Sequence, residues 1–233
     1  MNLAQHARIT FLGHEAGGGI VAPVAAKVDA ICKLPIPSNR KAVQRFLGMA
    51  GYYRRFCSNF SVVAAPLTDL VSPHKKFVWS PACQTAFDNI CSLLITTPVL
   101  RAPDFHRPFQ VQVDASDIGA GAVLLQTDDT NIMHPICYMS TKFKSFQKNY
   151  STIEKEAIAL LMALEKFEIY LGNTNQKFII YSDHNPLQFV SRMRNKNQRL
   201  TRWWLTLQCY NMEIRHIAGK DNLIADALSR ASD

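Results

Sequence analysis

Two acidic residues of this chain follow apolar stretches, where a carboxylate has no evident packing role. In "KFIIYSDHNPL" a run of β-branched and aromatic residues leads to Asp183, and such a run predicts a strand. In "PFQVQVDAS" apolar and polar residues alternate strictly up to Asp114, which predicts a second strand. Acids at neighbouring carboxyl ends of strands in an open sheet face the usual ligand crevice. Each acid also has a structural explanation, as a turn former before Gly119 or as part of the helix cap before Asn185.

Three further acids lie inside predicted helices of the same region. Glu154 and Glu156 flank the apolar stripe of "NYSTIEKEAIALLMALEKFEIYLG", about 80° to either side of it, so helical geometry does not choose between them. Asp226 lies between two alanines of "NLIADALSR", where no capping role explains it, and the alternative is a surface acid. A carboxylate in such a place can be a metal ligand or a catalytic group, as well as a structural acid. These acids are therefore candidates for a functional site.

The acids belong to a segment, about residues 107–230, whose pattern predicts a mixed α/β sheet. Three strand-like stretches follow one another, and then helix, strand, helix, strand and helix alternate. The long helix that carries both glutamates is expected to stop at Gly172. Asn185 is expected to cap the next helix, with Pro186 in its first turn. Further along, "NQRLTRWWLTLQ" predicts a helix and "MEIRHI" a strand.

The preceding residues, about 38–100, predict a basic helical bundle. Ser38 is expected to cap "RKAVQRFLGMAGYYRRF", and Ser80 followed by Pro81 is expected to open the helix of "SPACQTAFDNICSLL". Such a bundle could hold a duplex backbone, or it could simply expose a solvated basic face. Residues 1–37 are Gly-rich, contain the strand-like "ITFLGH", and on this pattern cannot close a core.

Composition narrows the class of protein. The chain of 233 residues is 48% hydrophobic and 19% charged, as expected for a globular protein with a real core. Its net charge of +8 favours a polyanionic partner such as nucleic acid. Six cysteines show no zinc-ligand spacing, which favours free thiols in a reducing compartment. No secretory signal opens the chain, and no apolar run is long enough to span a bilayer, so we expect an intracellular, cytoplasmic or nuclear, protein without membrane partners.

These features resemble the polymerase polyprotein of gypsy-type LTR retrotransposons and related retroviral elements. The matching strings run in family order over nearly the whole chain, among them "RFLGMAGYYRRFCSNFS", "FVWSPACQTAFDNI", "DASDIGAGAVLLQ", "NYSTIEKEAIAL", "YSDHNPL" and "GKDNLIADALSR". The resemblance implies a reverse-transcriptase palm remnant or linker over 1–37, a helical thumb-like domain over 38–100 and an RNase H-like domain over 107–230. The implied fold class is α/β (α+β), a five-stranded mixed sheet flanked by helices and preceded by the small helical domain.

The same resemblance implies a ribonuclease H that cleaves the RNA strand of RNA–DNA hybrids with two Mg²⁺ ions, or Mn²⁺ in their place. The catalytic and metal-binding tetrad that it implies is Asp114, Glu156, Asp183 and Asp226. The family string, with Glu just before "AIAL", selects Glu156. Tyr181-Ser182-Asp183-His184 looks superficially like the Tyr-x-Asp-Asp of a polymerase, but it lies after the thumb and resembles the Thr-Asp-His string of the RNase H domain. We therefore expect no polymerase activity.

Other residues are candidates for auxiliary and binding roles. His184 could orient a metal ligand, and His216 could carry a proton to the leaving oxygen; each also has a structural explanation, for His216 that of a satisfied strand histidine. The candidates for phosphate contacts are Arg45, Arg54, Arg55, Arg199 and Arg202. The tryptophans beside the last two, Trp203 and Trp204, are expected in the core. Two other readings stay open, a non-catalytic nucleic-acid-binding remnant and a part of a complete RNA-directed DNA polymerase; the oligomeric state is not predicted.

Overall fold

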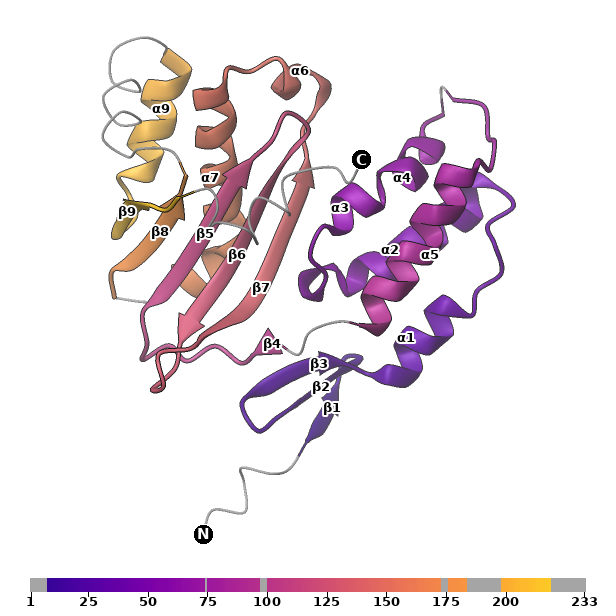
Figure 1. Cartoon of the computed structure of the whole chain (residues 1–233), viewed down its shortest axis with the longest axis horizontal. Coiled ribbons are helices and arrows are strands. Elements are labelled where there is room, and N and C mark those ends of the chain that lie inside the picture. Colours follow the sequence, from indigo (N-terminus) through magenta and orange to yellow (C-terminus); the bar gives the residue numbers. More distant parts are fainter. Residues whose placement is uncertain (1–7, 74, 97–99, 173–175, 184–197, 219–233) are drawn as a thin grey trace. The chain divides into compact units, whose positions relative to one another are not determined.

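The computed structural model describes residues 8–73, 75–96, 100–172, 176–183 and 198–218 (Figure 1). Its contacts divide the chain into two compact units, residues 1–102 and 103–233. The predicted helices after Asn185 and around Asp226 lie outside the described residues. None of the helices in the described part combines the length and apolar character that crossing a membrane requires.

A five-stranded mixed sheet forms the centre of the second unit (Figure 1). Its strands are β5 (Phe109–Ala115), β6 (Gly119–Thr127), β7 (Met133–Lys142), β8 (Phe178–Ser182) and β9 (Met212–His216). They lie in the order β7-β6-β5-β8-β9. The first three in sequence are antiparallel neighbours, while β8 pairs parallel with β5 and β9 pairs parallel with β8. This arrangement confirms the predicted fold class.

Helix α7 (Thr152–Leu171) packs against β5 and β6. The predicted apolar stripe is the buried face of this helix at Ala157, Leu160 and Leu164, and Phe167 is also fully buried. Two shorter helices belong to the same unit, α6 (Ser145–Lys148) and α9 (Gln198–Leu207), and α9 packs on α7. The core lies between the sheet and these helices, which holds the ends of β5 and β8 in fixed places beside α7.

The first unit combines four short strands with helices (Figure 1). The strands β1 (Ile9–Phe11), β2 (His14–Gly17), β3 (Ile20–Pro23) and β4 (Leu100–Arg101) pair antiparallel in that order. The helices are α1 (Ala25–Cys32), α2 (Arg40–Tyr52), α3 (Phe60–Val63), α4 (Ala65–Val71) and α5 (Pro81–Ile95), with a short 3₁₀ turn at Arg54–Phe56. The rings of Phe46 and Phe87 join α2 to α5, with centroids 4.5 Å apart.

Three local predictions for this unit need correction. "ITFLGH" is a hairpin rather than one strand, because Leu12 and Gly13 adopt positive φ angles of 46° and 77°. Asn39, not Ser38, caps α2, since its side chain accepts a hydrogen bond of 2.9 Å from the amide of Ala42. The N-terminal segment also contributes to a core: Val28 and Ile31 of α1 are buried. Ser80 and Pro81 open α5 as predicted.

Candidate metal-binding active site

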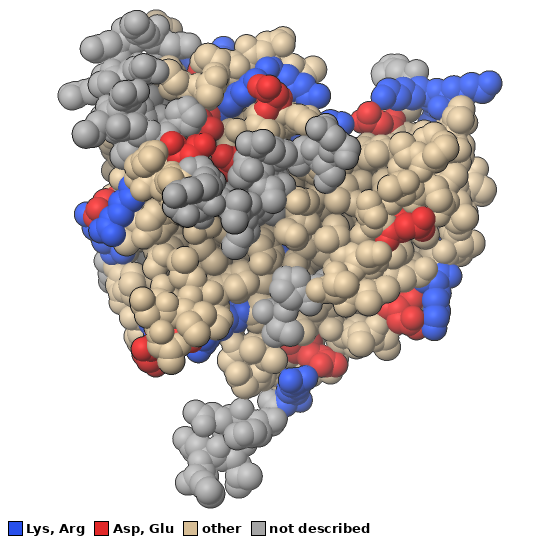
Figure 2. Space-filling view, viewed as in Figure 1, with Lys and Arg blue, Asp and Glu red and all other residues tan. Residues whose placement is uncertain are grey.

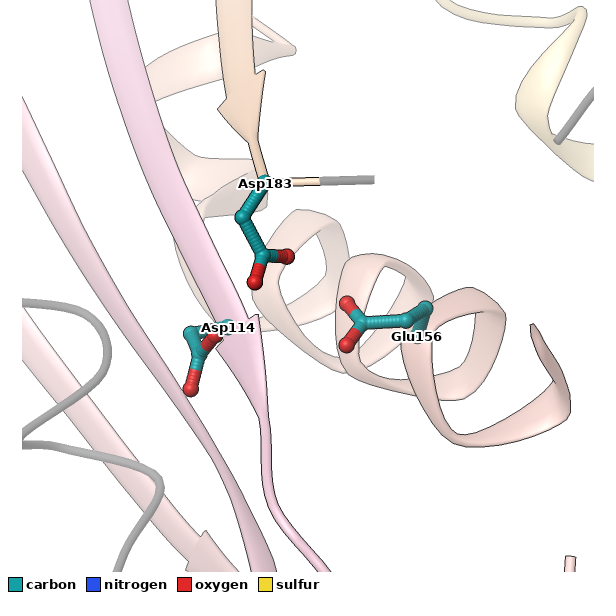
Figure 3. Close-up of side chains that lie close together, drawn as sticks. All are labelled: Asp114, Glu156 and Asp183. Atoms are coloured by element: carbon teal, nitrogen blue, oxygen red, sulfur yellow. The ribbon is translucent and has the colours of Figure 1, made fainter. Parts of the chain in front are cut away.

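Three acidic side chains converge at one edge of the five-stranded sheet. Asp114 comes from the penultimate position of β5, Asp183 directly follows β8, and Glu156 comes from the second turn of α7. One carboxylate oxygen from each lies within 4.8 Å of the others, and Figure 3 shows Glu156 and Asp183 directed toward the space beside Asp114. Asp114 and Glu156 are each only 4% exposed, and Asp183 is half-buried.

The backbone explains why the three side chains meet. β5 and β8 are parallel neighbours, with Val111 opposite Ile180, so their carboxyl ends reach the same edge of the sheet. The N-terminal turns of α7 begin at that edge, because a serine cap at Ser151 fixes where the helix starts. The site is therefore assembled from elements that are distant in sequence, each of which is held by the core.

Burial and repulsion act together on Glu156. Desolvation, followed by the charges of Asp114 and Asp183, raises the pKa of its carboxyl from 4.5 to about 9, and a hydrogen bond from the Ala115 amide opposes the rise. Desolvation disfavours the charged form, and like charges nearby disfavour it further. Without a cation, Glu156 therefore keeps a proton at neutral pH.

Glu154, the alternative that helical geometry left open, has a different role. Its carboxylate accepts hydrogen bonds from the amide and the hydroxyl of Ser151, at 3.0 and 2.9 Å, and completes a capping box. It also pairs with Arg199 at 3.3 Å. The structure thus uses Glu154 to start α7 and directs Glu156 to the other two acids.

Comparisons with known proteins bear on this geometry. Residues 104–210 match the family described as the RNase H-like domain found in reverse transcriptase. The chain is 38% identical over 221 residues to the retrovirus-related Pol polyprotein from transposon 297 of Drosophila melanogaster, covering 94% of this chain and 20% of that one. It is 36% identical over 230 residues to the transposon Tf2-3 polyprotein of Schizosaccharomyces pombe, covering 97% and 17%. The chain belongs to the gypsy-like retroelement polyproteins.

This retroelement chain spans about a fifth of the length of those curated relatives. Its fold is also that of solved foamy viral protease–reverse transcriptases. One, in complex with RNA/DNA hybrid, gives a TM-score of 0.77 at 22% identity, covering 91% of this chain and 29% of that one. Another, in complex with dsDNA, gives the same score and identity and covers 91% and 45%. The RNase H-like domain is thus supported by both sequence and fold.

Of the three other residues of the retroelement domain that were predicted to act in catalysis, only His216 lies within the described residues. Asp226 and His184 lie outside the described residues. His216 ends β9, is exposed, and lies opposite Ser182, the residue before Asp183. It therefore stands at the acidic edge of the sheet, where its proposed proton-carrying role stays a prediction.

The arginines predicted to bind phosphate differ in their exposure and in their contacts with other side chains. The guanidinium of Arg199 stacks over Tyr150, 4.6 Å from the ring centroid, in addition to its pairing with Glu154. Trp203 contacts the same tyrosine ring and, with Trp204, packs against the core, as predicted. Arg45, Arg54 and Arg202 are exposed, and Arg55 lies over the ring of Phe56.

Figure 2 shows that on the face drawn, Lys and Arg side chains of the described residues stand in small groups beside Asp and Glu. The net charge of this retroelement chain therefore does not by itself mark one continuous duplex-binding track on that face.

Residues that sequence reasoning missed border the acidic cluster. The Ser116 hydroxyl accepts hydrogen bonds from the amides of Ile118 and Gly119, at 3.2 and 3.1 Å, and so shapes the turn after β5. A serine directly after a strand is a turn signal that the sequence carries. Asp117 of this turn pairs with Lys155 at 2.7 Å, and no sequence pattern joins two residues so far apart.

Proposed function

We propose that this chain is a ribonuclease H, which cleaves the RNA strand of RNA–DNA hybrids endonucleolytically with divalent metal ions. The observation that carries the proposal is the convergence of Asp114, Glu156 and Asp183, within 4.8 Å, inside an RNase H-like domain. The fold shared with a foamy viral enzyme in complex with RNA/DNA hybrid also supports it.

The donor set fits hard divalent ions. All three groups offer carboxylate oxygens, which Mg²⁺ and Mn²⁺ prefer over the nitrogen and sulfur ligands typical of zinc. Burial and mutual repulsion disfavour three negative charges here, as the raised pKa of Glu156 indicates, and a bound cation would offset both effects. We propose Asp226 as a fourth ligand, as the family resemblance implies, and Mg²⁺ as the ion, with Mn²⁺ able to replace it.

The residues of the chain would act mainly by holding charge in place. When bound, divalent ions in such a site supply positive charge to the scissile phosphate and make water more acidic. Glu156 must release its proton before it can act as a carboxylate ligand, so ion binding is coupled to proton release. Asp114 and Asp183, held at the ends of neighbouring strands, would hold the ions at one edge of the sheet, so the reacting phosphate would be attracted to that edge. His216, exposed at that edge, is the proposed proton carrier for the leaving oxygen.

The proposed partner is an RNA–DNA duplex. Phosphate contacts from Arg45, Arg54, Arg55 and Arg202 would give affinity without sequence preference, with Arg199 reaching a phosphate only if it leaves Glu154. We propose that residues 38–100 act as a thumb-like domain in this binding and that the protein acts inside the cell.

The test is an assay of the full chain with a labelled RNA–DNA hybrid, in Mg²⁺ and in EDTA. We expect cleavage of the RNA strand in Mg²⁺ only, and loss of at least about 100-fold in rate for Asp114→Asn and Asp183→Asn. Glu154→Gln is the matched control for Glu156→Gln, because both substitutions remove one carboxylate from the same helix, and only the second should abolish cleavage. Tight hybrid binding without any cleavage would instead support the non-catalytic binding protein.

A further inference from the structure

A nearly buried lysine beside the acidic cluster pairs with an exposed aspartate. The Nζ atom of Lys155 lies 2.7 Å from a carboxylate oxygen of Asp117, and the two side chains are 11% and 95% exposed. Lys155 immediately precedes Glu156 in α7, and Asp117 lies three residues after Asp114 in the turn that follows β5. The ion pair therefore joins the two elements that carry two of the three clustered carboxylates.

Both ends of this ion pair are attached to well-fixed backbone. The turn is held by the hydroxyl of Ser116 and by a hydrogen bond of 2.8 Å from the Phe143 amide to the Ile118 carbonyl. A Cβ atom on Gly119 would lie 2.6 Å from the Thr141 carbonyl oxygen, so the turn is also pressed against β7. On the other side, the capping box fixes the first turn of α7. Two stiff pieces are thus connected by one charged contact.

We propose that Asp117 and Lys155 are positioning residues of the metal site, an inference that rests on the proposed function. When Glu156 gives up its proton to bind an ion, its negative charge and that of Asp114 repel each other, which tends to separate the end of β5 from α7. The ion pair resists this separation, because parting would leave a nearly buried ammonium group without its carboxylate. Asp117 and Lys155 thereby keep Asp114 and Glu156 at the spacing that a divalent ion requires, without contacting the substrate.

A purely electrostatic role makes a different prediction from a positioning role. If only charge mattered, removing the negative Asp117 would weaken cation binding, and removing the positive Lys155 would strengthen it. If the pair sets the spacing, removing either partner weakens cation binding. The sign of the Lys155 effect therefore separates the two explanations.

The experiment measures Mg²⁺ and Mn²⁺ affinity by calorimetry on the full chain, together with kcat and KM for hybrid cleavage. The variants are Asp117→Asn, Lys155→Met, their combination, and Asp117→Glu as the conservative replacement. Lys177→Met is the matched control, because it breaks an ion pair of similar length, 2.9 Å to Glu213, on the same unit. All affinities are taken at a temperature where every variant is folded.

We expect each single substitution to raise the Kd for the ion roughly 5- to 10-fold and to lower kcat while KM for the hybrid stays constant. The combined variant should be no worse than the worse single one, because the two residues act as a pair. Asp117→Glu and Lys177→Met should stay within about twofold of wild type. Tighter ion binding by Lys155→Met, or additive losses in the combined variant, would overturn the positioning role.

A second measurement does not depend on metal. In EDTA, amide hydrogen exchange at Ile118, Gly119 and Lys155 should be faster in both single variants than in wild type, and unchanged in Lys177→Met. Unchanged exchange in both would overturn the proposal. If wild type neither binds a divalent ion nor cuts the hybrid, the proposed function fails, and the exchange rates alone then decide whether the pair ties the turn to α7.

Discussion

Glu156 holds a carboxyl group where a carboxylate is unfavourable, because burial and two neighbouring acids oppose its charge. Such a group lowers the stability of the metal-free fold, and the arrangement is useful only if a cation compensates for it. Asp114 and Asp183 share the same surroundings through their proximity. At the scale of single residues, the candidate site is therefore a place where stability and the proposed function oppose each other.

The shifted pKa predicts how stability depends on pH. In the unfolded chain Glu156 titrates near 4.5, and in the folded chain near 9. The folded state holds this proton more tightly than the unfolded state. The resulting contribution to the free energy of unfolding is therefore full below pH 4.5 and is lost as the pH rises toward 9. In EDTA, we expect the free energy of unfolding of wild type to fall by about 2 kcal/mol between about pH 5 and 7, relative to that of Glu156→Gln. Urea unfolding at both pH values measures this, and parallel pH dependences would contradict it.

The repulsion among the acids also predicts a response to Asp183→Asn. Removing one of the like charges should raise the metal-free melting temperature by about 2 to 4 °C, as about 1 kcal/mol does for a protein of this size. The same change should shrink the rise that Mg²⁺ produces in wild type, because a ligand is lost. Thermal scans in EDTA and in Mg²⁺ measure both effects. Glu165→Gln, at an exposed acid of the same helix, is the control and should alter neither.

At the scale of elements, the sequence predicts much of the site, and its limits have physical causes. Asp114 and Asp183 could be found because both lie at the carboxyl ends of patterned strands. The choice of Glu156 needed the family resemblance, although Ser151-x-x-Glu154 is itself a capping-box pattern that assigns Glu154 to the helix start. The pairing of β3 with β4 and of Lys155 with Asp117 depends on the tertiary fold, and no local pattern encodes either.

Replacing glycine by alanine is expected to have opposite effects on stability at two positions. Gly119→Ala in β6 would place a Cβ atom 2.6 Å from the backbone oxygen of Thr141, and we expect a loss of about 1 to 3 kcal/mol in the second unit. Gly48→Ala in α2 meets nothing within 4 Å and should stabilise the first unit by about 0.5 to 1 kcal/mol, through helix propensity. Urea unfolding of each variant measures these values. A destabilised Gly48→Ala would show that the space beside this helix is not free.

At the scale of the whole molecule, the chain consists of two compact units. The five-stranded fold of the second unit follows from strand and helix patterns that are long and regular. The first unit was harder to predict, because its strands are only two to four residues long and depend on a hairpin at Leu12 and Gly13. Short strands stabilised by distant partners leave little trace in sequence.

The division predicts that residues 103–233 fold alone. Beginning at 103 keeps the reciprocal hydrogen bonds of Asp104 and Gln126, at 2.9 and 2.7 Å. We expect this shorter chain to bind hybrid more weakly, because Arg45, Arg54 and Arg55 are absent. Its salt dependence should also be shallower, by about 0.9 in log–log slope per lost phosphate contact on duplex DNA. Circular dichroism and hybrid binding at several salt concentrations test this. Equal affinity and slope for both chains would contradict a substrate-holding first unit.

The turn between β6 and β7 offers a position for labelling the domain away from its acidic cluster. β6 runs antiparallel to β5, so this turn lies at the end of the sheet opposite to Asp114. It is closed locally, by hydrogen bonds from Thr130 and Ile132 to the Asp128 carboxylate and by His134 at 2.8 Å from the same group. The acidic cluster and this locally closed turn therefore lie at opposite ends of the sheet. We therefore expect that a fluorescent label attached at this turn leaves hybrid cleavage unchanged.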